Sequence, residues 1–313
     1  MGGIGIVNNP GSRRNRRRPG IARRLRERLA HDGEVLDAST PDELARAVER
    51  FRAAGIDVLG VNGGDGTVHY VLTAFARAYG KEPLPKLLLL RGGAMNTVAR
   101  GNGVRGGPEG ILREALIRVR HGYPLRTIER DLLRVSADGR EASYGFIFGT
   151  GIMVAFLEAY YATGRPSPAM AAFLVARAFG SVLVNGEFAR ALTRREPLRV
   201  STDGDEWPDA SYLALAAGST PDIGFGFRPF ARCDEQPGFF HAVGLVGPLP
   251  QLALAAPRIR RGRPWRRRLA QDELARTLLV QGERPRFTVD GDIYEAERSV
   301  TIETGPGVEI VVP

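Results

Sequence analysis

Residues 58–70 read VLGVNGGDGTVHY, and this stretch decides how the N-terminal part of the chain folds. Its first four residues are an apolar run, which predicts a buried strand. Three glycines then permit a sharp turn, because glycine adopts backbone angles closed to other residues: Gly63, Gly64 and Gly66. We expect Thr67 to cap a following helix, and free N–H groups at a helix start attract phosphate. An ordinary strand–turn–helix connection has the same pattern, so both interpretations stay open here.

Asp65 is the carboxylate inside this glycine turn. A carboxylate beside bound phosphate is useful mainly when Mg²⁺ or a reacting hydroxyl lies between the two. Asp65 is therefore our first candidate for a metal ligand and for a residue that takes part in catalysis.

Composition limits the chemistry open to this chain. Its 313 residues fit one large or two medium domains, and nearly all of the basic residues behind the net charge of +9 are arginines. Lys81 and Lys86 are the only lysines, so the phosphate loop GxxxxGK(S/T) cannot be written and Schiff-base chemistry is disfavoured. Cys233 is the single cysteine, which excludes intrachain disulfides and thiolate zinc sites. The four histidines show no metal-binding spacing.

The cellular location is predicted from two further features. The chain starts with a strand-like run at residues 4–7, so we expect no signal peptide. Its longest uncharged run, residues 142–157, falls short of a membrane span and is broken by glycines. We therefore expect a soluble, cytoplasmic protein.

Apolar runs and helical patterns alternate along the first 120 residues. Strands are predicted near residues 4–7, 35–36, 58–61 and 87–90. Helices are predicted near residues 21–30, 41–54, from 67 onward and 108–120. This order is typical of a Rossmann-like parallel α/β domain, whose site is formed by loops at the carboxyl edge of the sheet.

Two more loops follow strands of this predicted sheet. Residues 91–97 form a second glycine turn after the fourth strand. Two glycine turns after neighbouring parallel strands can face each other across a crevice, which is more informative than either turn alone. The other loop follows the first strand and precedes several arginines, which suits a polyphosphate: Asn8, Asn9, Pro10, Gly11 and Ser12. A solvated basic surface turn explains this loop equally well.

From about residue 128 the pattern changes to short alternating strands, which predicts a second domain: a mainly antiparallel β-sandwich. The strands are predicted at residues 131–137, 142–148, 198–202, 211–217, 239–245, 276–281, 286–289 and 299–303. Residues 154–195 are predicted to be a mostly helical insert, apolar enough for core packing and for the wall of an apolar channel. We place the domains at residues 1–127 and 128–303, with a return of residues 304–313 to the first domain left open.

Five motifs stand in order along the chain: residues 9–12 (NPGS), Thr40, residues 63–67 (GGDGT), residues 93–100 (GAMNTVAR) and residues 289–292 (VDGD). Together they resemble the diacylglycerol kinase catalytic family, in particular bacterial lipid kinases related to diacylglycerol, sphingosine and ceramide kinases. The family elements are NPxSG, a nucleotide-contacting threonine, GGDGT, GTxNxxAR and VDGE. The resemblance covers essentially the whole chain. GGDG alone is shared with NAD kinases and phosphofructokinases, so the joint set makes it specific.

The resemblance implies transfer of the γ-phosphoryl group of ATP to a lipid hydroxyl, with Mg²⁺, in a cleft between the two domains. It implies these nucleotide-binding residues: Asn8, Asn9, Pro10, Gly11, Ser12, Thr40, Gly63, Gly64, Asp65, Gly66, Thr67, His69, Gly92, Gly93, Ala94 and Asn96. Asp65 becomes the Mg²⁺-linked carboxylate. Asp290 or Asp292 becomes the general base, and because Asp292 is one methylene shorter than the family glutamate, Asp290 shares the candidacy. The alternative for this motif is a plain DG hairpin turn.

The nucleotide-binding motifs depart from the family pattern at two positions. Ala94 replaces a threonine, which removes one hydroxyl contact to the nucleotide. Tyr70 stands where the family usually has glutamate, while His69 resembles the sphingosine-kinase form of the stretch. The charge of the absent lysine is left to one of four arginines, among which the sequence does not choose: Arg13, Arg14, Arg16 or Arg91.

A third departure lies in residues 230–239, where the family binds a structural Mg²⁺. Pro237 replaces the family aspartate, and Asp234 and Glu235 lie just upstream. These two acids are candidate metal ligands. A charged loop before a strand is at least as good an explanation.

Residues 258–268 contain a dense run of arginines around Trp265, a residue typical of membrane interfaces. Anionic lipid surfaces attract such segments by roughly 1 kcal/mol per basic residue. We expect peripheral contact with the inner face of an anionic membrane and no nucleic-acid partner. A basic surface loop and a nucleic-acid patch are the alternatives, and a homodimer stays open.

Three functions are compatible with these observations. The leading one is an ATP-dependent kinase for diacylglycerol, a sphingoid base, ceramide or a related lipid alcohol. The second is an NAD-kinase-like phosphotransferase with a soluble substrate, which the apolar insert and residues 289–292 disfavour. The third is a non-catalytic lipid- or nucleotide-binding homologue that lost activity through Ala94, Tyr70 and Pro237.

Overall fold

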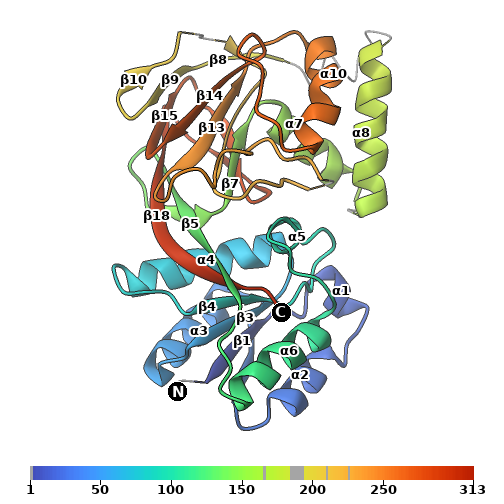
Figure 1. Ribbon diagram of the computed structural model, residues 1–313, viewed down its shortest axis with the longest axis vertical. Coiled ribbons are helices and arrows are strands. Elements are labelled where there is room, and N and C mark those ends of the chain that lie inside the picture. Colours follow the sequence, from blue (N-terminus) through green and yellow to red (C-terminus); the bar gives the residue numbers. More distant parts are fainter. Residues whose placement is uncertain (1–2, 165–166, 184–193, 209–210, 225) are drawn as a thin grey trace. The chain divides into compact units, whose positions relative to one another are not determined.

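The computed structural model describes residues 3–164, 167–183, 194–208, 211–224 and 226–313 (Figure 1). The chain forms two compact units. Unit 1 consists of Met1–Arg130 and Pro306–Pro313, and unit 2 consists of Asp131–Gly305. Strand β18 (Ser299–Val311) contributes its first residues to unit 2 and its last residues to unit 1.

Unit 1 is a parallel sheet with helices, which confirms the predicted α/β class. Its strands are β1 (Ile4–Asn8), β2 (Gly33–Asp37), β3 (Val58–Asn62) and β4 (Lys86–Leu89), in the spatial order β2-β1-β3-β4. The end of β18 adds a fifth parallel strand, with Ile310 opposite Leu87. Helices α1 (Arg13–Arg16), α2 (Ile21–Leu29), α3 (Pro41–Ala54), α4 (Asp65–Tyr79), α5 (Thr97–Gly101) and α6 (Pro108–Arg120) connect the strands.

Local sequence explains why these elements begin and end where they do. In α3, Thr40 caps the first turn. The Thr40 hydroxyl accepts the backbone N–H of Glu43, and the Glu43 carboxylate accepts the backbone N–H of Thr40. Gly55 ends the helix in the left-handed region at φ 59°. Strands β1 and β3 are buried along their whole length, as expected for central strands of a parallel sheet.

Unit 2 is a β-sandwich, as predicted. One layer is an antiparallel sheet in the order β14-β13-β12-β7-β16-β17. The other layer contains β10, β9, β15, β5, β6 and the first part of β18. Phe148, Leu215 and Phe240 of the first layer share one buried core with Val280 and Val300 of the second.

The strands of unit 2 have these bounds: β5 (Thr127–Ala137), β6 (Ser143–Gly145), β7 (Ile147–Thr150), β8 (Glu196–Pro197), β9 (Arg199–Thr202), β10 (Asp205–Glu206), β11 (Ser211–Tyr212), β12 (Ala214–Gly218), β13 (Phe240–Leu245), β14 (Ala270–Ala275), β15 (Thr277–Gln281), β16 (Arg286–Val289) and β17 (Asp292–Glu295). The short strands β8 and β11 form a separate pair. Strand β14 lies outside the predicted strands, and β17 extends the predicted hairpin beyond Val289.

The helices of unit 2 are α7 (Ile152–Ala162), α8 (Pro168–Leu183) and α10 (Leu249–Arg260). The first two lie in the predicted helical insert, whose residues 165–166 and 184–193 are outside the described part of the chain. Helix α10 was not predicted. Among the described residues, no helix is both long and apolar enough to span a bilayer.

Candidate functional site

Three loops meet at the carboxyl edge of the unit 1 sheet, after β1, β3 and β4. The Asn9 amide donates to the Thr67 hydroxyl oxygen at 2.9 Å, and the Ser12 hydroxyl lies 3.3 Å from the same oxygen. The Arg14 backbone N–H donates to the Gly92 carbonyl at 3.0 Å, which joins the first loop to the third. Loops that the sequence places 50 to 80 residues apart therefore form one surface.

The two glycine turns touch each other directly. A Cβ atom on Gly93 would lie 2.2 Å from the Cα of Gly64, and one on Gly63 would lie 2.3 Å from the Cβ of Thr67. A Cβ on Gly92 would lie 2.8 Å from the Asn62 side-chain oxygen. The glycines are therefore needed so that the backbones can approach. The Gly93 N–H itself donates to the Asn96 side-chain oxygen at 3.0 Å.

Buried asparagines support these loops from beneath. The Asn62 amide donates to the Asn8 side-chain oxygen at 2.7 Å, and the Asn15 amide donates to the carbonyls of Asn62 and Asn9 at 2.9 and 2.8 Å. The Asn8 amide also donates to Asp37. In this structure Asn8 therefore holds the loops in place, and its contact with a nucleotide stays a prediction.

Asp65 connects the two glycine turns. It is the first residue of α4, and its Oδ1 accepts the Val98 backbone N–H of α5 at 3.2 Å. Burial raises the pKa of this carboxyl to about 6, although the backbone N–H groups of Val98, Thr97 and Asn96 oppose the rise. The carboxylate is thus fixed in position by donors of the second turn.

Thr67 does not cap the helix, so that prediction is wrong. Helix α4 begins at Asp65, and Gly64 with an extended backbone is the N-cap residue. The Thr67 hydroxyl instead contacts Asn9 and Ser12 of the first loop. The loop after β1 supplies these hydrogen-bond partners, and the sequence around Thr67 does not reveal them.

Two arginines make this edge electropositive. Arg14 donates to the Arg91 carbonyl at 3.4 Å, and Arg91 donates to the Gly106 carbonyl at 3.0 Å. Burial lowers the pKa of both guanidinium groups, and the neighbouring positive charges of Arg18 and Arg100 lower it further. Neither arginine forms an ion pair with a carboxylate in the described part of the chain. Unpaired, crowded positive charge of this kind favours an anion.

The remaining nucleotide-binding candidates of unit 1 differ in their surroundings. Thr40 lies on the surface, and its hydroxyl accepts the Glu43 N–H at 3.3 Å. The His69 side chain is only 1% exposed within α4, whereas Tyr70 beside it is 54% exposed. Asn96 has φ 51° and hydrogen-bonds both backbone groups of Gly93 through its amide. Ala94 is half-buried in this same turn. The contacts of these four residues with a nucleotide stay predictions.

The loop of residues 8–12 also has internal order. The Gly11 backbone N–H donates to the Asn9 side-chain oxygen at 2.9 Å. Ser12 is buried, whereas Pro10 and Gly11 are exposed at the surface. The turn is therefore preformed, which favours its predicted role as a ligand loop.

In unit 2, residues 290–291 form the hairpin turn between β16 and β17. Asp290 has φ 49° and Gly291 has φ 102°. The Asp290 carboxylate accepts the backbone N–H groups of Phe146 and Ile147 at 3.1 and 2.9 Å. This side chain therefore anchors the turn to the neighbouring strands.

Asp292 is different. Burial raises the pKa of its carboxyl to about 6. Its Oδ2 is buried and accepts no hydrogen bond from any described residue. Of the two candidates for a general base, Asp292 is thus the one with an unused acceptor atom.

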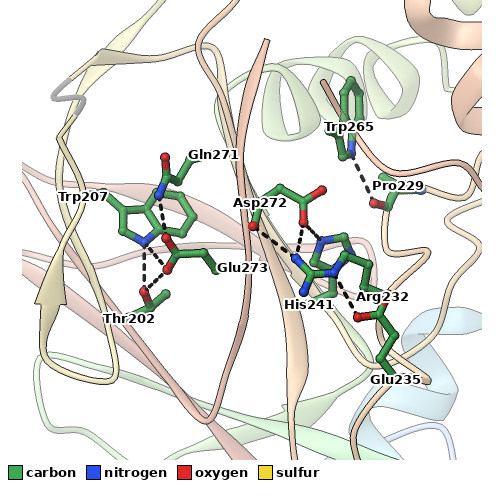
Figure 2. A network of polar contacts seen from close by, with 10 residues as sticks. All are labelled: Thr202, Trp207, Pro229, Arg232, Glu235, His241, Trp265, Gln271, Asp272 and Glu273. Carbon is green, nitrogen blue, oxygen red and sulfur yellow. Dashed lines mark hydrogen bonds and ion pairs between the residues drawn. The ribbon is translucent and has the colours of Figure 1, made fainter. Parts of the chain in front are cut away.

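Glu235, one of the two candidate metal ligands of residues 230–239, pairs with the Arg232 guanidinium (Figure 2). The Arg232 guanidinium donates to Glu235 at 3.1 Å and to Asp272 of β14 at 2.8 Å. The ring of His241, which is fully buried, lies 2.8 Å from the same oxygen of Asp272. Asp234 is exposed. In the described ranges no three His, Cys, Asp or Glu residues gather around a point that could hold a metal ion, and the metal role of Asp234 and Glu235 stays a prediction.

Unit 2 also contains an apolar cavity of about 310 Å³. Helices α7, α8 and α10 and strands β12 and β13 supply most of its wall. The described residues that line it are all apolar: Ile152, Met153, Val175, Ala178, Leu213, Ala214, Ala216, Ile223, Phe227, Pro229, Phe230, Val243, Leu245, Leu249, Leu252, Ala253, Ala256, Ile259 and Trp265. The sequence could have revealed the part of this wall that α10 supplies, because apolar residues recur there every three or four positions.

Trp265 lies in the wall of this cavity. It is half-buried, and its indole N–H donates to the Pro229 carbonyl at 3.2 Å (Figure 2). Its role at a membrane interface stays a prediction.

Comparison with known families identifies the N-terminal region. Residues 4–123 match the diacylglycerol kinase catalytic domain. This match confirms the resemblance carried by the glycine turns, and it supports a function of the lipid-kinase type. No curated protein sequence matches the chain significantly.

Solved structures confirm the two-part fold. A diacylglycerol kinase from Bacillus anthracis is 14% identical with a TM-score of 0.64, over 99% of this chain and 97% of that one. Another Bacillus anthracis structure, provisionally assigned to the same class, is 16% identical with a TM-score of 0.69 over the same shares. Yeast NADH kinase in complex with NADH is 11% identical with a TM-score of 0.51, over 99% and 83%. At these identities the likeness concerns the fold.

Proposed function

We propose that this protein is an ATP-dependent lipid kinase that transfers the γ-phosphoryl group to a hydroxyl of a lipid alcohol. The observation that carries the proposal is the direct contact of Gly64 with Gly93, with Asp65 fixed between the two turns. This arrangement offers backbone N–H groups and a carboxylate at one sheet edge, within the region that matches a diacylglycerol kinase catalytic domain.

Phosphate binding is assigned to backbone groups and arginine. The glycine turns provide N–H donors, and Arg14 and Arg91 provide positive charge in place of the absent lysine. The sequence left four arginines as candidates for this charge. Arg14 and Arg91 are favoured because they lie beside Gly92 and have no carboxylate partner within the described residues. Arginine also suits phosphate because its planar fork donates two parallel hydrogen bonds.

Asp65 suits a Mg²⁺ ion bound together with ATP. Its carboxylate provides hard oxygen ligands and is held in place by the Val98 N–H. Burial, which raises its pKa, removes water that would stabilise the negative charge, and a bound cation would stabilise that charge instead. When bound, the ion would neutralise charge on the phosphates. One carboxylate is enough, since Mg²⁺ in such sites keeps several waters and phosphate oxygens as ligands.

Asp292 is the proposed general base, and Asp290 is its structural support. As the lipid oxygen forms a bond to the γ-phosphorus, the bond from phosphorus to the ADP oxygen breaks and the hydroxyl proton passes to the Asp292 carboxylate. The buried, unpartnered Oδ2 and the pKa of about 6 both favour proton acceptance near neutral pH. Asp290 cannot serve without releasing two backbone N–H groups.

The apolar cavity supports a lipid as the acceptor. Its 310 Å³ lies at the lower end of the range of ligand pockets, and the apolar side chains that the described part of the chain contributes to its wall suit an aliphatic chain. The same feature disfavours a soluble acceptor such as a dinucleotide. Diacylglycerol, a sphingoid base and ceramide all carry such chains beside a hydroxyl, so each is a candidate substrate.

The deciding experiment is transfer of ³²P from ATP to a panel of these lipids in detergent micelles with Mg²⁺. We expect a labelled lipid with the wild-type chain and none with Asp65→Asn, which keeps an oxygen for the Val98 N–H but removes the charge. Asp42→Asn, an exposed change at the start of α3, is the matched control and should keep full activity. If no lipid is labelled although ATP binds, the protein is the non-catalytic homologue; if only a soluble acceptor is labelled, it is the NAD-kinase-like phosphotransferase.

A further inference from the structure

Helix α10 has two faces of opposite character. One face lines the apolar cavity through Leu252, Ala256 and Ile259. On the other face Leu254 is 81% exposed, and Arg258 lies one turn further along. A large apolar side chain with this exposure contributes little to the packing of unit 2, and the basic residues begin four positions after it.

The segment that follows is strongly basic. Residues 258–268 contain seven arginines: Arg258, Arg260, Arg261, Arg263, Arg266, Arg267 and Arg268. No aspartate or glutamate occurs anywhere in residues 236–271. All of these arginines except the half-buried Arg258 are exposed. We call Leu254 together with these seven arginines the α10 basic surface.

These charges are not neutralised within the described protein. Some exposed arginines elsewhere pair with carboxylates, as Arg50 does with Glu34 and Arg52 with Glu82, each at 2.9 Å. None of the seven arginines forms an ion pair with a described residue; Arg260 instead lies 5.6 Å from the Phe227 ring centroid, and Arg258 donates to the Pro264 carbonyl. Seven such arginines within residues 258–268, with no acid in residues 236–271, concentrate positive charge that an external anion would neutralise.

Helix α8, which packs against α10 (Figure 1), adds an apolar surface beside these charges. Phe173 is 59% exposed there. Among the positions of α8 whose exposure is described, the others exposed after the first residue are Ala169, Ala172, Ala176, Arg177 and Gly180, of which one is charged. Basic residues beside an exposed apolar helix face match the interface of an anionic bilayer, whereas a nucleic acid would use the arginines alone.

We propose that the α10 basic surface and the exposed face of α8 dock onto an anionic lipid bilayer. Both helices also form the wall of the apolar cavity, through Val175 and Ala178 of α8 and Leu252 and Ala256 of α10. Docking on this side therefore places the cavity wall at the lipid surface. The inference rests on the proposed lipid kinase function for its purpose, but membrane binding can be measured without the reaction.

The test is sedimentation of the full chain with vesicles of phosphatidylcholine alone or with 30% phosphatidylglycerol. We expect binding to the anionic vesicles only. Replacement of Arg266, Arg267 and Arg268 by Gln should weaken it roughly 100-fold, because each basic residue near the surface contributes a similar increment. The matched control replaces Arg46, Arg50 and Arg52 of α3 by Gln, removes the same charge, and should bind nearly as wild type.

Leu254→Gln separates a bilayer from a nucleic acid. We expect roughly tenfold weaker binding to anionic vesicles, because a buried leucine side chain is lost from the interface, and no change in binding to duplex DNA. Equal binding to neutral and anionic vesicles, an equal loss in the α3 control, or DNA binding that exceeds vesicle binding and ignores Leu254 would each overturn the proposal.

Turnover of a short-chain diacylglycerol in solution, below its micelle concentration, distinguishes this proposal from the kinase proposal. The triple Gln variant of residues 266–268 should phosphorylate this soluble substrate at the wild-type rate and keep the wild-type melting temperature. Phosphorylation without vesicle binding would reject docking and keep the kinase. Vesicle binding without phosphorylation of any lipid would reject the kinase and keep docking.

Discussion

Two Asp-Gly turns, one in each unit, carry carboxyl groups whose pKa burial raises to about 6. In unit 1 the carboxylate of Asp65 accepts a backbone N–H from the neighbouring turn. In unit 2 the first acid, Asp290, accepts two backbone N–H groups, while Oδ2 of Asp292 is buried with no donor among the described residues. A raised pKa alone therefore does not define the role of a carboxyl group. A carboxylate that accepts backbone N–H groups suits a metal ligand or a structural anchor, and one without a donor suits a proton acceptor.

Of the two acids in the unit 2 turn, Asp292 is expected to show the larger effect on activity, as Asp292→Asn. Loss of the general base should lower kcat roughly 1,000-fold with little change in KM for ATP. Asp292→Glu, which restores the residue usual in the family, should keep activity or improve it. Steady-state kinetics on both variants and on Asp290→Asn check this. If Asp290→Asn is the inactive variant and Asp292→Asn is active, the two roles are exchanged.

The raised pKa of Asp292 also predicts a pH-dependent stability difference. Burial disfavours the ionised form in the folded state, so the cost is absent below the ordinary value of 3.8, grows between 3.8 and about 6, and is complete above 6. Asp292→Asn should therefore be more stable than wild type by up to about 3 kcal/mol at pH 8, and equally stable at pH 3.5. Urea unfolding at both pH values measures it. An equal difference at the two values would show that the carboxyl titrates normally.

Gly93→Ala tests whether the contact of the two turns in unit 1 matters. The added Cβ would meet the Gly64 backbone at 2.2 Å, so one turn must move, and a displacement of this size should reduce kcat/KM about 100-fold. Gly110→Ala in α6 is the matched control because its Cβ meets nothing within 4 Å. The control should keep activity and gain about 1 kcal/mol in unfolding free energy. Normal ATP affinity in Gly93→Ala, measured by calorimetry, would contradict the proposed phosphate site.

The smallest effect separates the anchor from the acceptor. Asp290→Ala should lower the unfolding free energy by about 2 kcal/mol, because it leaves the Phe146 and Ile147 N–H groups without an acceptor. It also places alanine at φ 49°, where Asn is tolerated better. Asp292→Ala loses no hydrogen bond to a described residue and should not be destabilised at pH 8. Equal losses in the two variants would remove the distinction drawn between these acids.

Much of unit 1 could be predicted because its signals are local. The helix predicted to start with the proline at residue 41 and to end near residue 54 is α3, and Gly55 ends it as predicted. The apolar runs after residues 57 and 86 became β3 and β4. Each signal depends on backbone angles or on a period of a few residues, which neighbours in the chain determine.

Strand β14 shows why other elements were missed. Its sequence, AQDELA, has two acids at its centre and no strand-like alternation. The acids point to opposite faces: Asp272 contacts Arg232 and His241, and Glu273 accepts from the Trp207 indole and the Thr202 hydroxyl (Figure 2). Partners from distant strands and loops make acidic residues acceptable inside this sheet, and no local pattern reveals such partners.

The sequence by itself determined where the glycine turns lie, that the first domain is a parallel α/β unit, and which carboxylates are candidates for chemistry. Only the tertiary structure decided that Gly64 touches Gly93, that Thr67 turns to Asn9 and Ser12, and that Asp290 is an anchor while Asp292 keeps an unused acceptor. The reason is physical. Backbone angles and apolar periods arise between neighbours in the chain, whereas desolvation and hydrogen-bond pairing depend on groups that distant segments bring to the same place.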